Sequence, residues 1–122
     1  MPINYEIEPD LRILCIRVTN PLTGRELSDY FHASRADELI GPTLNRLLDL
    51  RDVTDFPTVE EIVEAARERG FPLAAGAKMA VVANNNFAYG MARVFAGVTA
   101  DETIAVFRSE QLATEWLRSG HP

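Results

Sequence analysis

The sequence predicts a single α/β domain built on a mixed five-stranded sheet. Short apolar runs of strand length alternate with amphipathic segments of helical length, which is typical of parallel strands joined by helical crossovers. Two strand-like segments stand at the start with only a short turn between them, which indicates an antiparallel hairpin. The expected order of elements is therefore β-β-α-β-α-β-α-β-α. A chain of 122 residues has the size of one domain, so we expect residues 1–122 to form it.

Five segments have the composition of β-strands. The first alternates apolar and polar side chains, and the second is rich in β-branched residues and apolar on both faces. Between them, Glu8-Pro9-Asp10 is a turn signal. The last three are nearly continuous apolar runs, as expected for strands that are covered on both faces. The predicted strands are residues 3–7, 11–18, 44–50, 78–83 and 103–107.

Four segments have helical periodicity and recognisable ends. Thr23-Gly24-Arg25-Glu26 and Thr58-Val59-Glu60-Glu61 are capping-box patterns, and Asn86 and Ser109 are placed to cap the third and fourth helices. Glycines or a Gly-Pro pair follow the segments and indicate their ends: Gly41-Pro42, Gly70, Gly97 and Gly120. The expected apolar faces are Leu27, Tyr30, Phe31 and Ser34; Val59, Ile62, Val63 and Ala66; Phe87, Met91, Val94 and Phe95; and Leu112, Ala113, Trp116 and Leu117.

Composition restricts the classes of function. The formal net charge is −6 and the basic residues are dispersed, which argues against a nucleic-acid partner. Cys15 is the only cysteine, so no internal disulfide is expected, and its apolar neighbours predict a small buried side chain. No apolar run approaches the roughly 20 residues that span a bilayer, so we expect no membrane insertion. Met1-Pro2-Ile3-Asn4 has no features of a secretory signal, which predicts a cytoplasmic protein.

Polar residues follow the third and fourth predicted strands, at the ends where open α/β folds place their sites. The carboxyl ends of neighbouring parallel strands meet at one edge of a sheet, so these two groups should lie together. Amides there could orient a ligand, or could serve only as turn residues and caps. The predicted interaction surface comprises Asp52, Thr54, Asp55, Asn84, Asn85, Asn86, Phe87 and Tyr89.

The aromatic residues of the third helix divide between its faces. Phe87 and Tyr89 are two positions apart, which is about 200° around a helix, so they cannot both face the core. One of them should lie near the surface. With Met91 close by, the exposed ring would suit an interface or a lid over a ligand pocket.

The sequence predicts no catalytic, metal or cofactor site. Asp49, Asp52 and Asp55 could in principle hold Mg²⁺ or act as an acid and a base, but at a strand end they need not converge. Asp49 is expected to bond to the backbone or to an arginine instead. His32 and His121 have no partner at ligand spacing. No Gly-rich phosphate or dinucleotide motif is present.

The element order resembles the SpoIIAA-like fold, which is shared by STAS domains (sulphate transporter and anti-sigma-factor antagonist) and by related lipid-binding domains. The resemblance rests also on Leu48-Asp49-Leu50-Arg51-Asp52-Val53-Thr54-Asp55-Phe56 before a helix, and on the closing Val106-Phe107-Arg108-Ser109, Ala113 and Trp116-Leu117. The opening Ile3-Asn4-Tyr5-Glu6-Ile7 is similar to small stand-alone bacterial proteins of this fold. The resemblance to the SpoIIAA-like fold covers essentially the whole chain and implies a non-enzymatic regulatory domain.

Thr58 has two interpretations. In STAS antagonists an Asp-Ser pair precedes the second helix, and a partner kinase phosphorylates the serine. These positions are Pro57 and Thr58 here, so the hydroxyl is kept and the Asp-Ser pair is lost. The resemblance implies a phosphosite, whereas the residues by themselves indicate a helix cap worth about 1 kcal/mol. Asp55, Glu60 and Glu61 would repel a phosphate at this place.

Together these observations predict a regulatory or protein-interaction module of STAS-like type. Its partner would be another protein or a second copy of the chain in a homodimer. The alternative is a binder of a small apolar or amphipathic ligand, in a pocket at the carboxyl edge of the sheet. The residues that would line this pocket are Phe56, Phe71, Phe87, Tyr89 and Met91.

Overall fold

The computed structural model describes residues 3–8, 12–19, 21–36, 44–68, 77–99 and 104–119. Its elements follow the predicted order. The strands are β1 Ile3–Glu8, β2 Ile13–Thr19, β3 Asn45–Asp52, β4 Met79–Val82 and β5 Ile104–Phe107. The helices are α1 Gly24–Ala36, α2 Val59–Glu68, α3 Asn86–Thr99 and α4 Glu110–Arg118. Several predicted turn, end and pocket residues lie outside the described residues: Pro9, Asp10, Gly41-Pro42, Gly70, Phe71, Thr103, Gly120 and His121.

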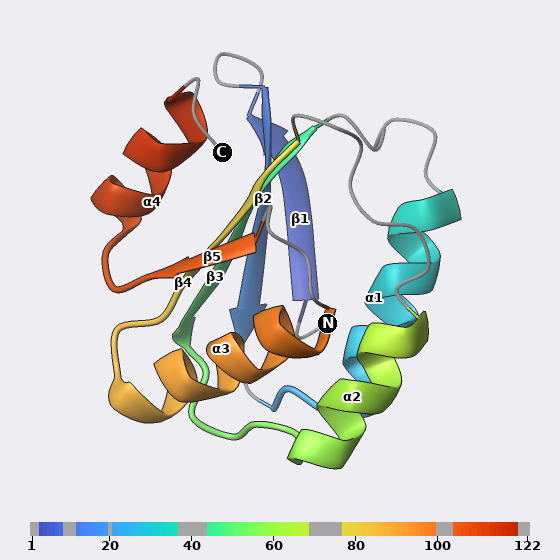
Figure 1. Cartoon of the computed structure of the whole chain (residues 1–122). Coiled ribbons are helices and arrows are strands. Elements are labelled where there is room, and N and C mark those ends of the chain that lie inside the picture. The colour runs from blue at the N-terminus through green and yellow to red at the C-terminus, as the bar shows by residue number, and fades with distance from the viewer. Residues whose placement is uncertain are drawn as a thin grey trace.

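The five strands form one sheet in the order β1-β2-β3-β4-β5 (Figure 1). β1 runs antiparallel to β2, and each later strand runs parallel to the one before it. The predicted mixed sheet with an N-terminal hairpin is therefore confirmed. Arg12, just before β2, has a φ of 54°, the left-handed conformation that a turn often requires.

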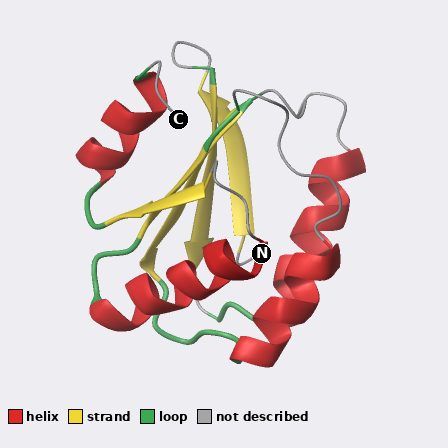
Figure 2. Cartoon of the chain, in the orientation of Figure 1, coloured by secondary structure: helices red, strands yellow, loops and turns green. Residues whose placement is uncertain are grey.

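The helices cover the sheet unequally. α1, α2 and α3 lie on one face and α4 lies alone on the other (Figure 2). Each of the first three helices joins a strand to the parallel strand beside it. Right-handed crossovers that proceed in one direction across a sheet keep their helices on the same face. α4 follows the last strand and packs on β3, β4 and β5 from the opposite side, which leaves β1 and β2 largely open there.

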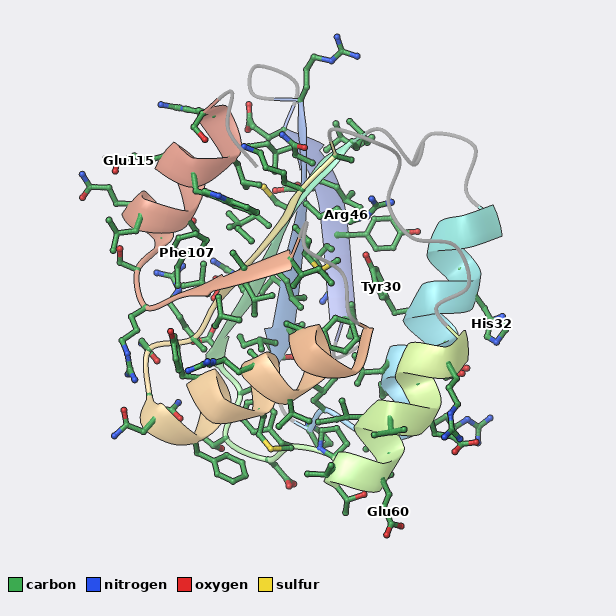
Figure 3. All side chains as sticks on the ribbon, in the orientation of Figure 1. Tyr30, His32, Arg46, Glu60, Phe107 and Glu115 are labelled. Atoms are coloured by element: carbon green, nitrogen blue, oxygen red, sulfur yellow. The ribbon has the colours of Figure 1, made fainter. Side chains whose placement is uncertain are left out.

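A hydrophobic core lies on each face of the sheet. The larger core fills the space under α1, α2 and α3, and includes Leu14, Ile16 and Val18 of β2. The smaller core lies under α4 and includes Ile13 of the same strand. Figure 3 shows Tyr30 pointing from α1 toward the sheet, whereas His32, Glu60 and Glu115 point outward. Strand alternation thus divides one strand between two cores.

Lys78 holds the C-terminal end of α4 against the sheet. Its side chain is only 6% exposed, and its Nζ donates to the carbonyl oxygens of Trp116 at 2.6 Å and Ser119 at 2.8 Å. The ammonium also lies 4.8 Å from the centre of the Trp116 ring. Asn45 adds a bond from its Nδ2 to the Leu117 carbonyl at 3.3 Å. These bonds satisfy carbonyls that a helix end otherwise leaves unpaired. Burial lowers the pKa of Lys78.

Three residues of the predicted apolar faces are exposed, and one of them, Phe87 of α3, is 61% exposed. Val59 is 50% exposed because it is the first residue of α2, one turn before the buried Ile62. Leu112 is 54% exposed, since it lies about 100° around α4 from the buried Ala113. Within the described ranges, no helix is both long enough and apolar enough to cross a membrane.

Candidate functional site

The turn after β3 and the loop after β4 meet at one edge of the sheet. They follow neighbouring parallel strands, in which Asp49 is in register with Val82. The rings of Phe56 and Phe87 join them, with centroids 5.5 Å apart in an edge-to-face arrangement. We call this region the carboxyl-edge surface. It comprises Asp52, Thr54, Asp55, Thr58, Asn84, Asn85, Asn86, Phe87 and Tyr89.

Buried residues fix the shape of the turn after β3. Val53 is fully buried, and its N–H donates to the Leu50 carbonyl at 3.1 Å. Pro57 is buried as well. The Leu22 N–H, just before α1, donates to the Asp55 carbonyl at 3.1 Å. The backbone is thereby anchored, while the side chains of Asp52, Thr54, Asp55 and Thr58 are exposed.

Thr58 forms the capping box that the sequence predicts. The Glu61 N–H donates to Thr58 Oγ1 at 3.1 Å, and the Thr58 N–H donates to Glu61 Oε1 at 3.0 Å. The hydrogen bonds from Thr58 lower the pKa of the Glu61 carboxyl. The hydroxyl is exposed, and in this geometry it acts as the N-cap of α2.

The N-cap of α3, in the loop after β4, is one residue earlier than predicted. α3 begins at Asn86, and the Ala88 N–H donates to Asn85 Oδ1 at 2.8 Å. Asn85 is therefore the cap, and the prediction of Asn86 was wrong by one position. Asn86 Oδ1 instead accepts from Arg108 Nη1 at 3.0 Å. All three asparagines, Asn84 included, are exposed at this edge.

Phe87, not Tyr89, is the exposed aromatic residue. Phe87 is 61% exposed, while Tyr89 is half-buried beneath Arg108, whose guanidinium carbon lies 4.3 Å from the ring centre. Arg108 follows β5 and contributes a cation from a third strand end. Sequence reasoning gave this arginine no role. Its position directly after the fifth predicted strand was the signal that could have placed it at this edge.

The three aspartates spaced by three do not form a cluster. Asp49 and Asp52 lie on either side of a register shift between β2 and β3, where Arg17 pairs with Asp49 and Thr19 pairs with Asp52. Asp49 accepts from Arg51 Nε and Nη2, both at 2.9 Å, as the sequence predicts for an arginine partner. Among the described residues, no group of three or more His, Cys, Asp or Glu side chains could hold a metal ion.

An apolar cavity of about 50 Å³ lies inside the larger core, between the sheet and α1, α2 and α3. Phe56 and Met91 line it, as expected for the alternative function. Phe87 and Tyr89 do not contribute to the lining, and Phe71 lies outside the described residues. The cavity therefore belongs to the core and not to the exposed edge.

The family model described as SpoIIAA-like matches residues 13–118. The chain belongs to the SpoIIAA-like family. A similar solved structure is the crystal structure of an uncharacterized protein from the DUF3478 family, with a SpoIIAA-like fold, from Shewanella loihica PV-4. The two chains are 18% identical, with a TM-score of 0.61 over 94% of this chain and 91% of the other. This likeness shows the fold alone. The curated proteins give no match.

Membership of the SpoIIAA-like family identifies the chain as a STAS-like module, as the resemblance implied. The match covers the strand, turn and helix start that form the carboxyl-edge surface, because residues 45–68 lie within it.

Proposed function

We propose that this protein is a non-enzymatic interaction module that binds a protein partner in the cytoplasm through the carboxyl-edge surface. The observation that carries the proposal is Phe87. Its ring is 61% exposed and is supported from behind by Phe56. An aromatic ring that is exposed yet held in place by a neighbour loses little conformational freedom on binding, which is typical of an interface anchor.

The residues around Phe87 give the surface a polar rim. Asn84 and Asn86 lie on one side of the ring in the chain, and Asp52 and Asp55 come from the neighbouring turn. An apolar centre with a polar rim is the usual anatomy of a protein interface. The exposed carboxylates favour a partner that presents basic residues.

The same carboxylates disfavour a second copy of the chain at this surface. A two-fold symmetric dimer brings the same patch of each copy face to face. Asp52 and Asp55 would then oppose their own counterparts, in a chain whose formal net charge is already −6. A different protein of opposite charge fits the surface better than a homodimer does.

The test is affinity capture from an extract of the source organism with three forms of the protein. The wild type, Phe87→Ser and Leu112→Ser are compared by quantitative mass spectrometry. Leu112 is the matched control because it is 54% exposed on α4, on the other face of the sheet. A partner retained by the wild type and Leu112→Ser but lost with Phe87→Ser supports the proposal. Equal recovery by all three forms contradicts it.

We further propose Thr58 as the place where this binding is regulated. A phosphate on Thr58 would replace the hydroxyl that accepts from Glu61 and would lie beside the carboxylates of Glu60 and Glu61. Phosphorylation should therefore open the first turn of α2 and alter the adjoining surface. Thr58→Ala is expected to lower the free energy of unfolding by about 1 kcal/mol, and Thr58→Ser to keep it.

Urea unfolding measures the capping effect, and mass spectrometry of protein from its own source detects the phosphate. A phosphate mapped to Thr58, together with altered partner affinity of the phosphorylated form, supports regulation. If Thr58→Ala lowers stability, leaves partner binding unchanged and the native protein carries no phosphate, Thr58 is a helix cap only.

A second function, binding of a small apolar or amphipathic ligand, is favoured by the apolar cavity under α1, α2 and α3. A volume of about 50 Å³ is well below that of most ligand pockets, which are about 300–1,000 Å³. A ligand would therefore have to move the helices away from the sheet. Native mass spectrometry before and after denaturation tests this function. A released apolar molecule supports it, and an empty protein that binds no aromatic dye contradicts it.

A further inference from the structure

A second surface lies on the face of the sheet that α4 only partly covers. There a groove of about 440 Å³ runs over β1, β2 and β3 and ends at the first residue of α4. Its volume is within the range of small-molecule sites. The side chains that matter to the argument are Asn4, Glu6, Cys15, Arg17, Asp49 and Glu110. The groove shares no residue with the carboxyl-edge surface.

The strand register arranges these side chains in two rows across the sheet. Arg17 of β2 is paired with Asn4 of β1 on one side and with Asp49 of β3 on the other. Two residues earlier in β2, Cys15 is paired with Glu6 on the β1 side. Paired residues point to the same face of a sheet. The rows are separated by two residues, which is about 7 Å along a strand.

Arg17 and Glu6 are the charged groups of the groove that remain available to a ligand. Asp49 is held by Arg51, which also approaches Glu110 Oε2 at 3.7 Å. By contrast, the side chains of Glu6 and Arg17 are exposed and form no hydrogen bond or ion pair with the described part of the chain. The groove therefore offers a guanidinium in one row and a carboxylate in the other.

The electrostatic environment of the two rows differs in sign. Burial raises the pKa of the Cys15 thiol, and carboxylates near it raise the pKa further, namely those of Glu8, Glu6 and Glu110. In the other row, burial by itself would raise the pKa of Asp49, but the bonds and charge of Arg51 and the charge of Arg17 lower it. The charges around Cys15 are thus carboxylates, whereas the charges around Asp49 are the guanidinium groups of Arg51 and Arg17.

We propose that this groove binds a small zwitterion of amino-acid type, with its carboxylate on Arg17 and its amine on Glu6. A guanidinium pairs with a carboxylate through two parallel hydrogen bonds. A spacing of about 7 Å between the rows accommodates the two charged ends of one amino acid with a hydrogen bond at each. A simple anion would meet Glu6 and Glu110, and a simple cation would meet Arg17, so each is opposed by one row.

The first experiment screens the unmodified protein for a thermal shift with each of the common protein amino acids. The best of them is then titrated by calorimetry together with two of its own derivatives, the N-acetyl form and the carboxamide. Each derivative lacks one of the two charges. Because a hydrogen bond to a charged group contributes about 1.5–3 kcal/mol, each derivative should bind at least about tenfold more weakly than the amino acid.

Variants locate the site. Arg17→Gln and Glu6→Gln change exposed side chains, so both proteins should fold, and each should weaken binding about tenfold. Arg25→Gln on α1 and Glu64→Gln on α2 are matched controls on the other face of the sheet and should bind like the wild type. Phe87→Ser should also bind normally, which separates this site from the carboxyl-edge surface.

Three results would overturn the proposal. The first is that no amino acid shifts the melting temperature or saturates the protein. The second is that a derivative with one charge removed binds as tightly as the amino acid, which would make the groove a simple cation or anion site. The third is that Arg17→Gln and the Arg25→Gln control have the same affinity.

Discussion

Asp49 accepts three hydrogen bonds from one neighbour two positions along the chain. The Arg51 N–H and Nε donate to Oδ1 at 3.0 and 2.9 Å, and Nη2 donates to Oδ2 at 2.9 Å. Burial opposes the charge of this carboxylate, but the bonds from Arg51 outweigh it and lower the pKa of Asp49. The pair lies near the end of β3, and Asp49 lines the groove.

The lowered pKa of Asp49 predicts a pH-dependent contribution to stability. A group whose pKa falls on folding stabilises the protein above its unfolded pKa, about 3.9 for Asp, and loses this effect as the pH falls through the folded value. Asp49→Asn should therefore lower the free energy of unfolding by about 1 kcal/mol at neutral pH. The difference from wild type should shrink below about pH 4.

Urea unfolding at a series of pH values measures this difference. Glu64→Gln is the control, because Glu64 has a side chain that is 71% exposed and only a 3.7 Å contact with Arg67. It should have little effect at any pH. A gap between wild type and Asp49→Asn that persists undiminished at acid pH would show that Asp49 is not stabilised by its charge.

Two glycines in helices differ in what surrounds them. A Cβ on Gly24, the first residue of α1, would lie 2.9 Å from the Cβ of Glu61, which is held in the Thr58 capping box. A Cβ on Gly90, inside α3, would have no atom within 4 Å. Gly24→Ala should therefore destabilise the protein by about 1 kcal/mol or more. Gly90→Ala should stabilise it by about 0.5–1 kcal/mol, because alanine favours the helix.

Thermal or urea unfolding of the two alanine variants measures both effects side by side. Each variant serves as the control for the other, since the chemical change is the same. If both variants gain stability, the starts of α1 and α2 are not in the close contact that the structure shows.

At the residue scale, the sequence predicted local bonding partners better than it predicted which side chains are exposed. The bond between Asp49 and an arginine was predicted because the partner is local. Which of Phe87 and Tyr89 is exposed was not predicted. Helical spacing places the two side chains on different faces of α3 but does not say which face packs on the core. Arg108 was given no role because it lies 22 positions from Asn86, its hydrogen-bond partner.

At the scale of elements, α4 is attached by polar bonds as well as by its apolar face. Lys78, just before β4, reaches the Trp116 and Ser119 carbonyls, and Ala113 and Leu117 are buried against the sheet. Trp116 is the only tryptophan in the chain, so its fluorescence reports on the docking of this helix. The groove depends on the same docking, because Glu110 forms part of its wall.

Lys78→Met should weaken the docking of α4. The variant keeps an apolar chain of similar length but removes the ammonium that donates to the Trp116 and Ser119 carbonyls, which costs about 1–3 kcal/mol. The free energy of unfolding should fall by that amount, and Trp116 emission should shift to the red. Arg118→Met, an exposed change in the same helix, is the control. Unchanged emission and stability in Lys78→Met would contradict the role given to Lys78.

The strand boundaries could be predicted from local sequence patterns, whereas contacts between distant residues could not. Every strand was predicted within about two residues, because apolar runs and turn signals are local. Lys78 was taken as the start of the fourth strand, and its function as a helix anchor was not foreseen. That function depends on contacts with Trp116 and Ser119, 38 and 41 positions later.

At the scale of the whole molecule, the order of the elements makes the two faces of the sheet different. Three crossover helices enclose an apolar core on one face, whereas a single helix leaves part of the other face open and charged. The order of elements was predictable because alternation of strands and helices restricts topology. The open groove was not, because it results from where α4 lies relative to β1 and β2.

The central claim is that the protein acts by binding a partner at Phe87. The most direct measurement is the dissociation constant of the captured partner for wild type, Phe87→Ser and Leu112→Ser by titration calorimetry. An interface anchor contributes about 2 kcal/mol or more, so Phe87→Ser should weaken binding at least about thirtyfold while Leu112→Ser matches wild type. Equal affinities of Phe87→Ser and wild type, with both proteins folded, would contradict the claim.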